Sequence, residues 1–153
     1  MPTPRPSAES ALATSSAQPH VVLYDGTCGF CHASVQWLLA HDPAGHFSFA
    51  ALQGETAATL RARHPELPND LDSVLLVEHV GHPSERVWWR SHAVFRICGY
   101  IGGIWAVPGL LRFLPRFLTD ALYMTVARVR HRLAPAPEAC QLPTEAQSQR
   151  FLP

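Results

Sequence analysis

The 153-residue chain contains no lysine; its twelve basic residues are all arginine, and they balance twelve acidic residues. The absence of lysine excludes chemistry that needs a lysine Schiff base or a phosphate-binding P-loop lysine. A formal net charge of zero and an isoelectric point near 7.1 give no electrostatic reason to expect nucleic-acid binding. The function is therefore sought among classes that need neither lysine nor a strongly charged surface.

Cysteine is also scarce. The four cysteines, Cys28, Cys31, Cys98 and Cys140, are too few and too unevenly spaced for a disulfide-framework domain. One close pair plus two single residues is typical of a reducing compartment with a redox or metal-binding role. Residues 1–19 lack the sustained apolar core of a secretory signal and are rich in Pro, Ser, Ala and Thr. We expect a cytoplasmic protein with a disordered tail over residues 1–19.

From His20 onward, strand-like and helix-like segments alternate in a chain that is 47% hydrophobic, enough for one buried core. We expect strands at 21–24, 46–52, 73–77 and 86–90, and helices at 31–41, 55–64 and 92–100. Two parallel strands joined by a helix, then a hairpin and another helix, follow the element order of the thioredoxin-like fold. The prediction is an α/β protein with a thioredoxin-like mixed sheet, flanking helices and a redox core over residues 20–100.

The segment from Val21 to Cys31 combines an apolar run, a turn and two cysteines at the start of a predicted helix. A helix N-terminus carries about half a positive charge, so a thiol placed there ionises more readily. A second sulfur three positions later is close enough to form a disulfide with the first. The pattern therefore predicts thiol–disulfide exchange through Cys28 and Cys31.

The expected positions of the two sulfurs suggest their roles. We expect Cys28 just before the helix with its sulfur exposed, and Cys31 in the first turn and more covered. Cys28 is then the attacking thiolate and Cys31 the resolving thiol. Two alternatives stay open: a pair of inert buried cysteines, or a structural zinc site completed by Cys140 and a histidine. Cys98 is expected to be a small core residue of its helix.

Asp25, one turn from the thiols, has two open roles. Its carboxyl could relay protons to or from Cys31 if burial raises its pKa. Alternatively, it caps the turn by accepting hydrogen bonds from loop N–H groups. Thr27 is the expected N-cap of the helix that follows, and Ser91 the expected N-cap of the helix after the hairpin.

A family resemblance rests on the segment Tyr24-Asp25-Gly26-Thr27-Cys28-Gly29-Phe30-Cys31. It resembles the signature of the DCC family of thiol–disulfide oxidoreductases, an Asp-x-x-Cys-x-x-Cys motif matched here by Asp25, Cys28 and Cys31. The similarity covers roughly residues 20–152. It implies a thioredoxin-like fold and disulfide exchange with a disulfide-containing protein or a small thiol. An unidentified reductant would return the protein to its dithiol form. No cofactor or metal is expected.

The chain departs from thioredoxin proper in front of the predicted third strand. Thioredoxins place a cis-proline there, opposite the cysteines, where it shapes the peptide-binding groove. Here Leu71-Asp72-Ser73 occupies that place, and the nearest prolines are Pro65 and Pro68. The groove is therefore built differently, or the substrate is not peptide-like.

Residues 100–133 form a strongly apolar segment that thioredoxin lacks. Glycine, proline and arginine interrupt it well short of the roughly 20 apolar residues that a membrane span needs. We expect two or three short helices that pack on the core as part of a C-terminal helical extension over residues 101–153.

A sharper alternative for residues 100–133 is contact with a membrane surface or a partner protein. The segment has a basic edge that could favour anionic lipid, formed by Arg112, Arg116, Arg128, Arg130 and Arg132. A second function class follows, a non-catalytic thioredoxin-like adaptor or membrane-surface binding module whose cysteines are structural. In that class, changes at Trp105 or Phe113 matter more than changes at the cysteines.

Overall fold

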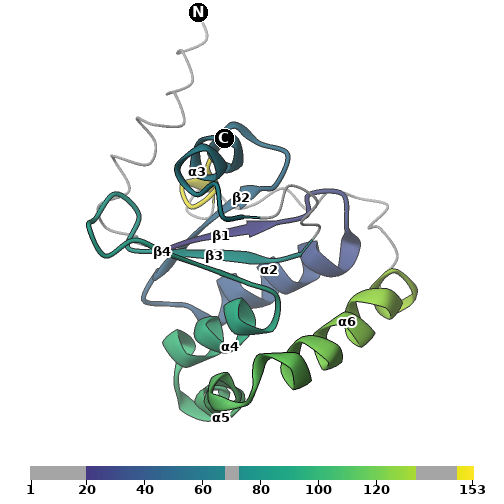
Figure 1. The fold of residues 1–153 in the computed structure, drawn as a ribbon. Coiled ribbons are helices and arrows are strands. Elements are labelled where there is room, and N and C mark those ends of the chain that lie inside the picture. Colours follow the sequence, from purple (N-terminus) through teal and green to yellow (C-terminus); the bar gives the residue numbers. More distant parts are fainter. Residues whose placement is uncertain (1–19, 68–72, 134–147) are drawn as a thin grey trace, which may run out of the picture.

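A mixed four-stranded sheet lies at the centre of the protein (Figure 1). The computed structural model describes residues 20–67, 73–133 and 148–153, so the tail expected over 1–19 and the lone Cys140 lie outside the described residues. The strands are β1 (His20–Tyr24), β2 (Phe47–Ala51), β3 (Leu75–Glu78) and β4 (Arg86–Trp89). Their order is β2-β1-β3-β4, with β2 parallel to β1 and the other neighbours antiparallel. This arrangement confirms the predicted α/β class with a thioredoxin-like mixed sheet.

Helices cover both faces of the sheet (Figure 1). One face carries α3 (Glu55–Arg63), and the other carries α2 (Gly29–His41) and α4 (Arg90–Ile101). Because α2 connects the parallel strands β1 and β2, it must cross one face of the sheet and starts at the carboxyl end of β1.

β1 is apolar along most of its length because both of its faces are buried. Val21 and Leu23 belong to the buried cluster that includes α3, whereas Val22 and Tyr24 belong to the cluster that includes α2 and α4. A strand buried on both faces is a continuous apolar run rather than an alternating one, which made this strand recognisable in the sequence. The chain therefore leaves the sheet after Tyr24 from a tightly packed position.

Short helical turns follow α4 and pack closely on it: η1 (Gly103–Trp105), α5 (Ala106–Gly109) and η2 (Leu110–Phe113). Gly102 and Gly103 have φ angles of 71° and 58°, a region that favours glycine. A Cβ on Gly109 would lie only 3.1 Å from the backbone nitrogen of Gly99. The close approach of α5 to α4 therefore depends on a residue without a side chain.

The last helix, α6 (Arg116–Leu133), is longer than the short helices expected in this segment, with 18 residues. It returns alongside α2 and α4 (Figure 1). Ser91 does not cap α4, because the helix begins at Arg90 and Trp89 is its N-cap. Instead, the Ser91 hydroxyl donates a hydrogen bond of 2.6 Å to the Asp120 carboxylate of α6. Within the described residues, no helix is long and apolar enough to cross a membrane.

Residues 148–153 return to the outer edge of β2. The sequence did not predict this contact with the sheet. Phe151 forms a parallel bridge with Phe49, and the Phe49 N–H donates to the Arg150 carbonyl at 2.7 Å. The Arg150 guanidinium also pairs with the buried carboxylate of Asp42. The C-terminal segment is therefore tied to the sheet by backbone pairing and by a buried charge.

At the end of β3, the buried carboxylate of Glu78 accepts hydrogen bonds from neighbouring side chains. The Arg96 guanidinium donates at 2.6 Å and the Trp88 indole N–H at 2.8 Å. Burial pushes the pKa of Glu78 upward, but the hydrogen bonds from Arg96 and Trp88 outweigh it and keep the pKa below its ordinary value of 4.5. The carboxylate is therefore charged and contributes to stability.

We expect Glu78→Gln to lower the free energy of unfolding at neutral pH by roughly 2 kcal/mol, measured by urea titration, because Arg96 then lacks a charged partner. The native carboxyl binds its proton less tightly than the unfolded one. Its contribution is therefore present above pH 4.5 and is lost as the pH falls through the lower native pKa. The difference between the two proteins should shrink in acid; a difference independent of pH contradicts the assignment. Glu55→Gln, at an exposed position of α3, is the control with little effect.

Candidate active site

Both paired cysteines lie at the N-terminus of α2. Cys28 is the N-cap residue, with φ −95° and ψ 117°, and its carbonyl accepts the first helical hydrogen bond from His32 at 3.0 Å. Cys31 follows in the first turn of the helix. The unpaired N–H groups of this turn place partial positive charge beside both residues, a setting that favours thiolates.

The predicted capping role of Thr27 is wrong. The N-cap is Cys28, and no side chain caps the helix. The Thr27 hydroxyl instead donates to Asp25 Oδ1 at 2.7 Å, which engages it in the turn before the helix.

Asp25 holds the loop between β1 and α2 together. Its Oδ1 atom also accepts the Thr27 backbone N–H at 2.9 Å and the Gln53 side-chain amide at 3.2 Å. The Gln53 amide oxygen in turn accepts the Gly26 N–H at 3.3 Å. These bonds are those expected of a turn-capping carboxylate; the proton-relay role of Asp25 stays a prediction.

The exposure of the two thiols is the reverse of the expected one. Cys28 is buried, with 3% of its surface exposed, whereas Cys31 is partly exposed. The reason is the turn held by Asp25, which sends Gly26 and Thr27 into solvent, so that the chain has already turned inward at Cys28. In the structure both residues are thiols and do not form a disulfide.

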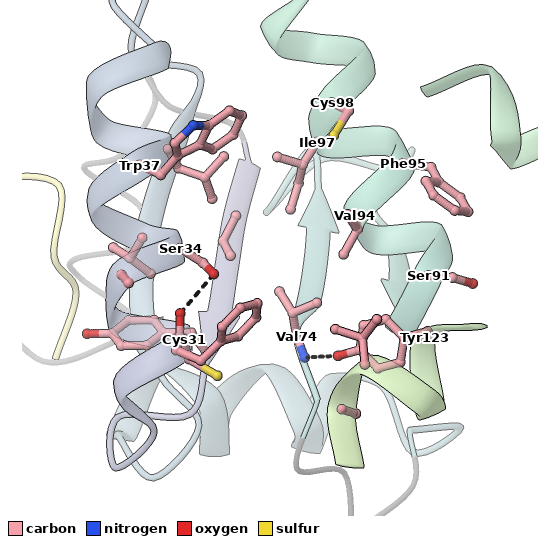
Figure 2. Close-up of a pocket in the computed structure, with 18 of the residues that line it drawn as sticks. Cys31, Ser34, Trp37, Val74, Ser91, Val94, Phe95, Ile97, Cys98 and Tyr123 are labelled. Atoms are coloured by element: carbon pink, nitrogen blue, oxygen red, sulfur yellow. Dashed lines mark hydrogen bonds between the residues drawn. The ribbon is translucent and has the colours of Figure 1, made fainter. Parts of the chain in front are cut away.

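Cys31 lines a pocket of about 550 Å³ between α2, α4 and α6 (Figure 2). Its walls are almost wholly apolar: they include Phe30, Trp37, Val94, Ile97, Leu122 and Val126. Cys98 lies at the opposite end of the pocket from Cys31 (Figure 2). It is buried, as predicted for a core residue, and burial raises the pKa of its thiol.

Two histidines that follow the predicted site residues in the sequence, His32 and His92, contact aromatic rings. His32 contacts the Tyr24 ring edge-on, and His92 stacks on Trp88 of β4. Burial lowers the pKa of His92, which favours the neutral ring. Among the described residues, no three His, Cys, Asp or Glu side chains are placed to hold a metal ion. The zinc alternative also needed Cys140, which lies outside the described residues.

The chain is similar to a known family of proteins. The family model of DCC1-like thiol–disulfide oxidoreductases matches residues 22–135. The chain belongs to this family. The matched residues include the loop, both paired cysteines and all of α6, so the pocket belongs to the DCC1-like part of the chain.

Two curated relatives resemble this DCC1-like chain over most of its length. One is YuxK of Bacillus subtilis (strain 168), an uncharacterized protein, with 32% identity over 142 residues, 92% of this chain and 99% of the relative. The other is a chloroplastic DCC family protein of Arabidopsis thaliana, with 34% identity over 125 residues, 80% of this chain and 69% of the relative. No solved structure gives a significant match.

The cysteines are recognisable in the sequence, but the pocket beside them was not predicted from it. The signal that was left unused is the spacing of Val94, Ile97 and Cys98, which places three apolar side chains on one face of α4. Tyr123 carried no such signal, because its role depends on α6 folding back. Its hydroxyl accepts a hydrogen bond from the Val74 N–H, at 3.4 Å, in front of β3.

Two substitutions at Asp25 separate its possible roles. Asp25→Ala removes the acceptor of the loop, and we expect the free energy of unfolding to fall by about 1 kcal/mol in urea titrations. Asp25→Asn keeps an acceptor oxygen and should retain most of that stability and the disulfide-exchange rate. If Asp25 relays protons, the Asn variant instead remains stable and loses exchange.

Proposed function

We propose that the protein is a thiol–disulfide oxidoreductase whose Cys28 and Cys31 cycle between a dithiol and a disulfide. The observation that carries the proposal is the placement of both thiols at the N-terminus of one helix, beside its partial positive charge. Family membership supports the same redox role. The partners are a disulfide-containing protein or a small thiol as substrate, and an unidentified reductant.

The burial of the two thiols favours Cys31 as the one that meets the substrate, the reverse of the order expected from the sequence. The Cys31 thiolate attacks one sulfur of the substrate disulfide, and the other sulfur leaves as a thiolate that takes up a proton. Cys28, as thiolate, then attacks the Cys31 sulfur of the mixed disulfide and releases the second substrate thiol. The protein loses two electrons, which reduce the substrate disulfide to two thiols.

Asp25 acts in this scheme by holding the loop that presents Cys28 to the Cys31 sulfur. We keep the cytoplasm as the proposed location, because a reducing compartment holds the two thiols ready to attack a disulfide.

A redox titration in glutathione buffers, followed by alkylation and mass spectrometry, tests the exchange. We expect one reversible two-electron transition that forms a disulfide between Cys28 and Cys31. With a disulfide substrate, Cys28→Ser should accumulate a mixed disulfide at Cys31, while Cys31→Ser should lose exchange. Cys98→Ser, which removes a thiol outside the pair, is the control that should still form the Cys28–Cys31 disulfide.

Absence of the Cys28–Cys31 disulfide at every glutathione ratio overturns the proposal, as does protection of both thiols by a bound metal. A mixed disulfide trapped by Cys31→Ser instead of Cys28→Ser reverses the order of attack and restores Cys28 as the attacking thiol.

A second candidate function is that of a non-catalytic, thioredoxin-like module attached to an anionic membrane surface. Among the described residues, the large exposed apolar side chains lie between residues 104 and 129, and they include Ile104, Phe113 and Phe117 at 73–78% exposure. Five arginines and a single aspartate occupy residues 100–133. An exposed apolar face with a positive edge is complementary to an anionic lipid surface.

Sedimentation with lipid vesicles tests this candidate. We expect binding to phosphatidylglycerol vesicles but not to phosphatidylcholine vesicles. Phe113→Glu should weaken this binding about tenfold, because a charge replaces a phenyl ring that the lipid would bury. Ala58→Glu, on α3 across the sheet, is the matched control and should bind like the wild type. Binding that is absent, or indifferent to Phe113→Glu, overturns the candidate.

A further inference from the structure

The pocket beside Cys31 offers a substrate almost nothing but apolar contact. Its lining residues include no Asp, Glu, Arg or His. The hydroxyl of Ser34 donates to the Phe30 carbonyl at 2.9 Å, and that of Ser91 donates to Asp120. A charged ligand would therefore lose its hydration in this pocket without gaining a charged partner.

The backbone of Val74, which lines the pocket, is also occupied. The Val74 N–H donates to the Tyr123 hydroxyl of α6, and the Val74 carbonyl accepts the Arg90 N–H at 3.1 Å. A peptide substrate that pairs through its own backbone would find neither group of Val74 available. The site is thus suited to a ligand that is held by its apolar surface rather than by main-chain hydrogen bonds.

The size of the pocket agrees with a small molecule. Its volume of about 550 Å³ lies within the range of ligand pockets in proteins, roughly 300–1,000 Å³. One wall contains Cys31, the more exposed of the paired thiols, so a disulfide inside the pocket lies next to a sulfur that can attack it (Figure 2).

We infer that this pocket is the substrate site of the exchange and that it selects small, uncharged, apolar disulfides. The inference rests on the proposed oxidoreductase function and adds the substrate class. The apolar arms of the disulfide lie between α2, α4 and α6, and one of its sulfurs faces Cys31. The Cys31 thiolate breaks the substrate S–S bond, Cys28 closes the protein disulfide, and two apolar thiols leave with the protons given up by the protein.

The test compares reduction of two disulfides by the reduced protein. Dipropyl disulfide and dithiodipropionate have arms of equal carbon number, but only the second is charged. Rates are divided by those of free mercaptoethanol with the same disulfides, which removes their intrinsic reactivity. We expect the protein to prefer dipropyl disulfide by at least about tenfold, because burial of the propyl arms is favourable and burial of the carboxylates is not.

Two matched variants each introduce one negative charge, one of them in the wall of the pocket and the other outside it. Leu122 and Leu118 both lie on α6, with 61% and 52% of their surfaces exposed, but only Leu122 lines the pocket. Leu122→Glu should remove most of the preference for dipropyl disulfide and speed the reaction with cystamine, whose arms are cationic. Leu118→Glu should leave the rates with dipropyl disulfide and with cystamine within about twofold of the wild type.

A binding measurement separates failure of the pocket from failure of the exchange. Fluorescence of the neutral dye phenylnaphthylamine, measured with Cys31→Ser, should fall when dipropyl disulfide displaces it, and Leu122→Glu should weaken dye binding more than Leu118→Glu. Exchange without apolar preference or dye displacement overturns the pocket and leaves the oxidoreductase. Displacement without exchange in the wild type supports the pocket and overturns the oxidoreductase.

Discussion

Burial of β1 on both faces is the constraint on which the rest of the structure depends. This strand lies between β2 and β3 and contributes to both apolar clusters of the core. Its carboxyl end therefore has a fixed position, and α2 must start within a few residues of it to cross back toward β2. This connection fixes the positions of the two thiols at the start of α2.

The sequence predicted the parts of the fold that depend on local apolar pattern. The strand from Val21 to Tyr24 was recognisable as a continuous apolar run, and the helix after Gly54 by its apolar residues and the prolines that follow it. The predictions of the two helix N-caps were wrong because capping does not depend on local pattern alone. A hydroxyl such as that of Thr27 or Ser91 has several possible partners, and the choice between the turn, the helix and a distant carboxylate is made by tertiary structure.

The candidate site divides in the same way. The presence and spacing of Cys28 and Cys31 were recognisable in the sequence, because the motif lies in one continuous segment. Their exposure was not, since it depends on which way the loop turns after Asp25 and on how α6 closes the space in front of α4. The pocket is built from three helices that are distant in the sequence, so no single stretch of the chain predicts it.

The pairing of the chain end with β2 bears on how this protein can be handled. The backbone bonds between Phe49 and residues 150–152 cover groups of an edge strand that would otherwise be open to another chain. A truncation that removes these residues uncovers that edge and also leaves the Asp42 carboxylate without Arg150. Self-association through exposed strands is the expected hazard of removing residues 150–152.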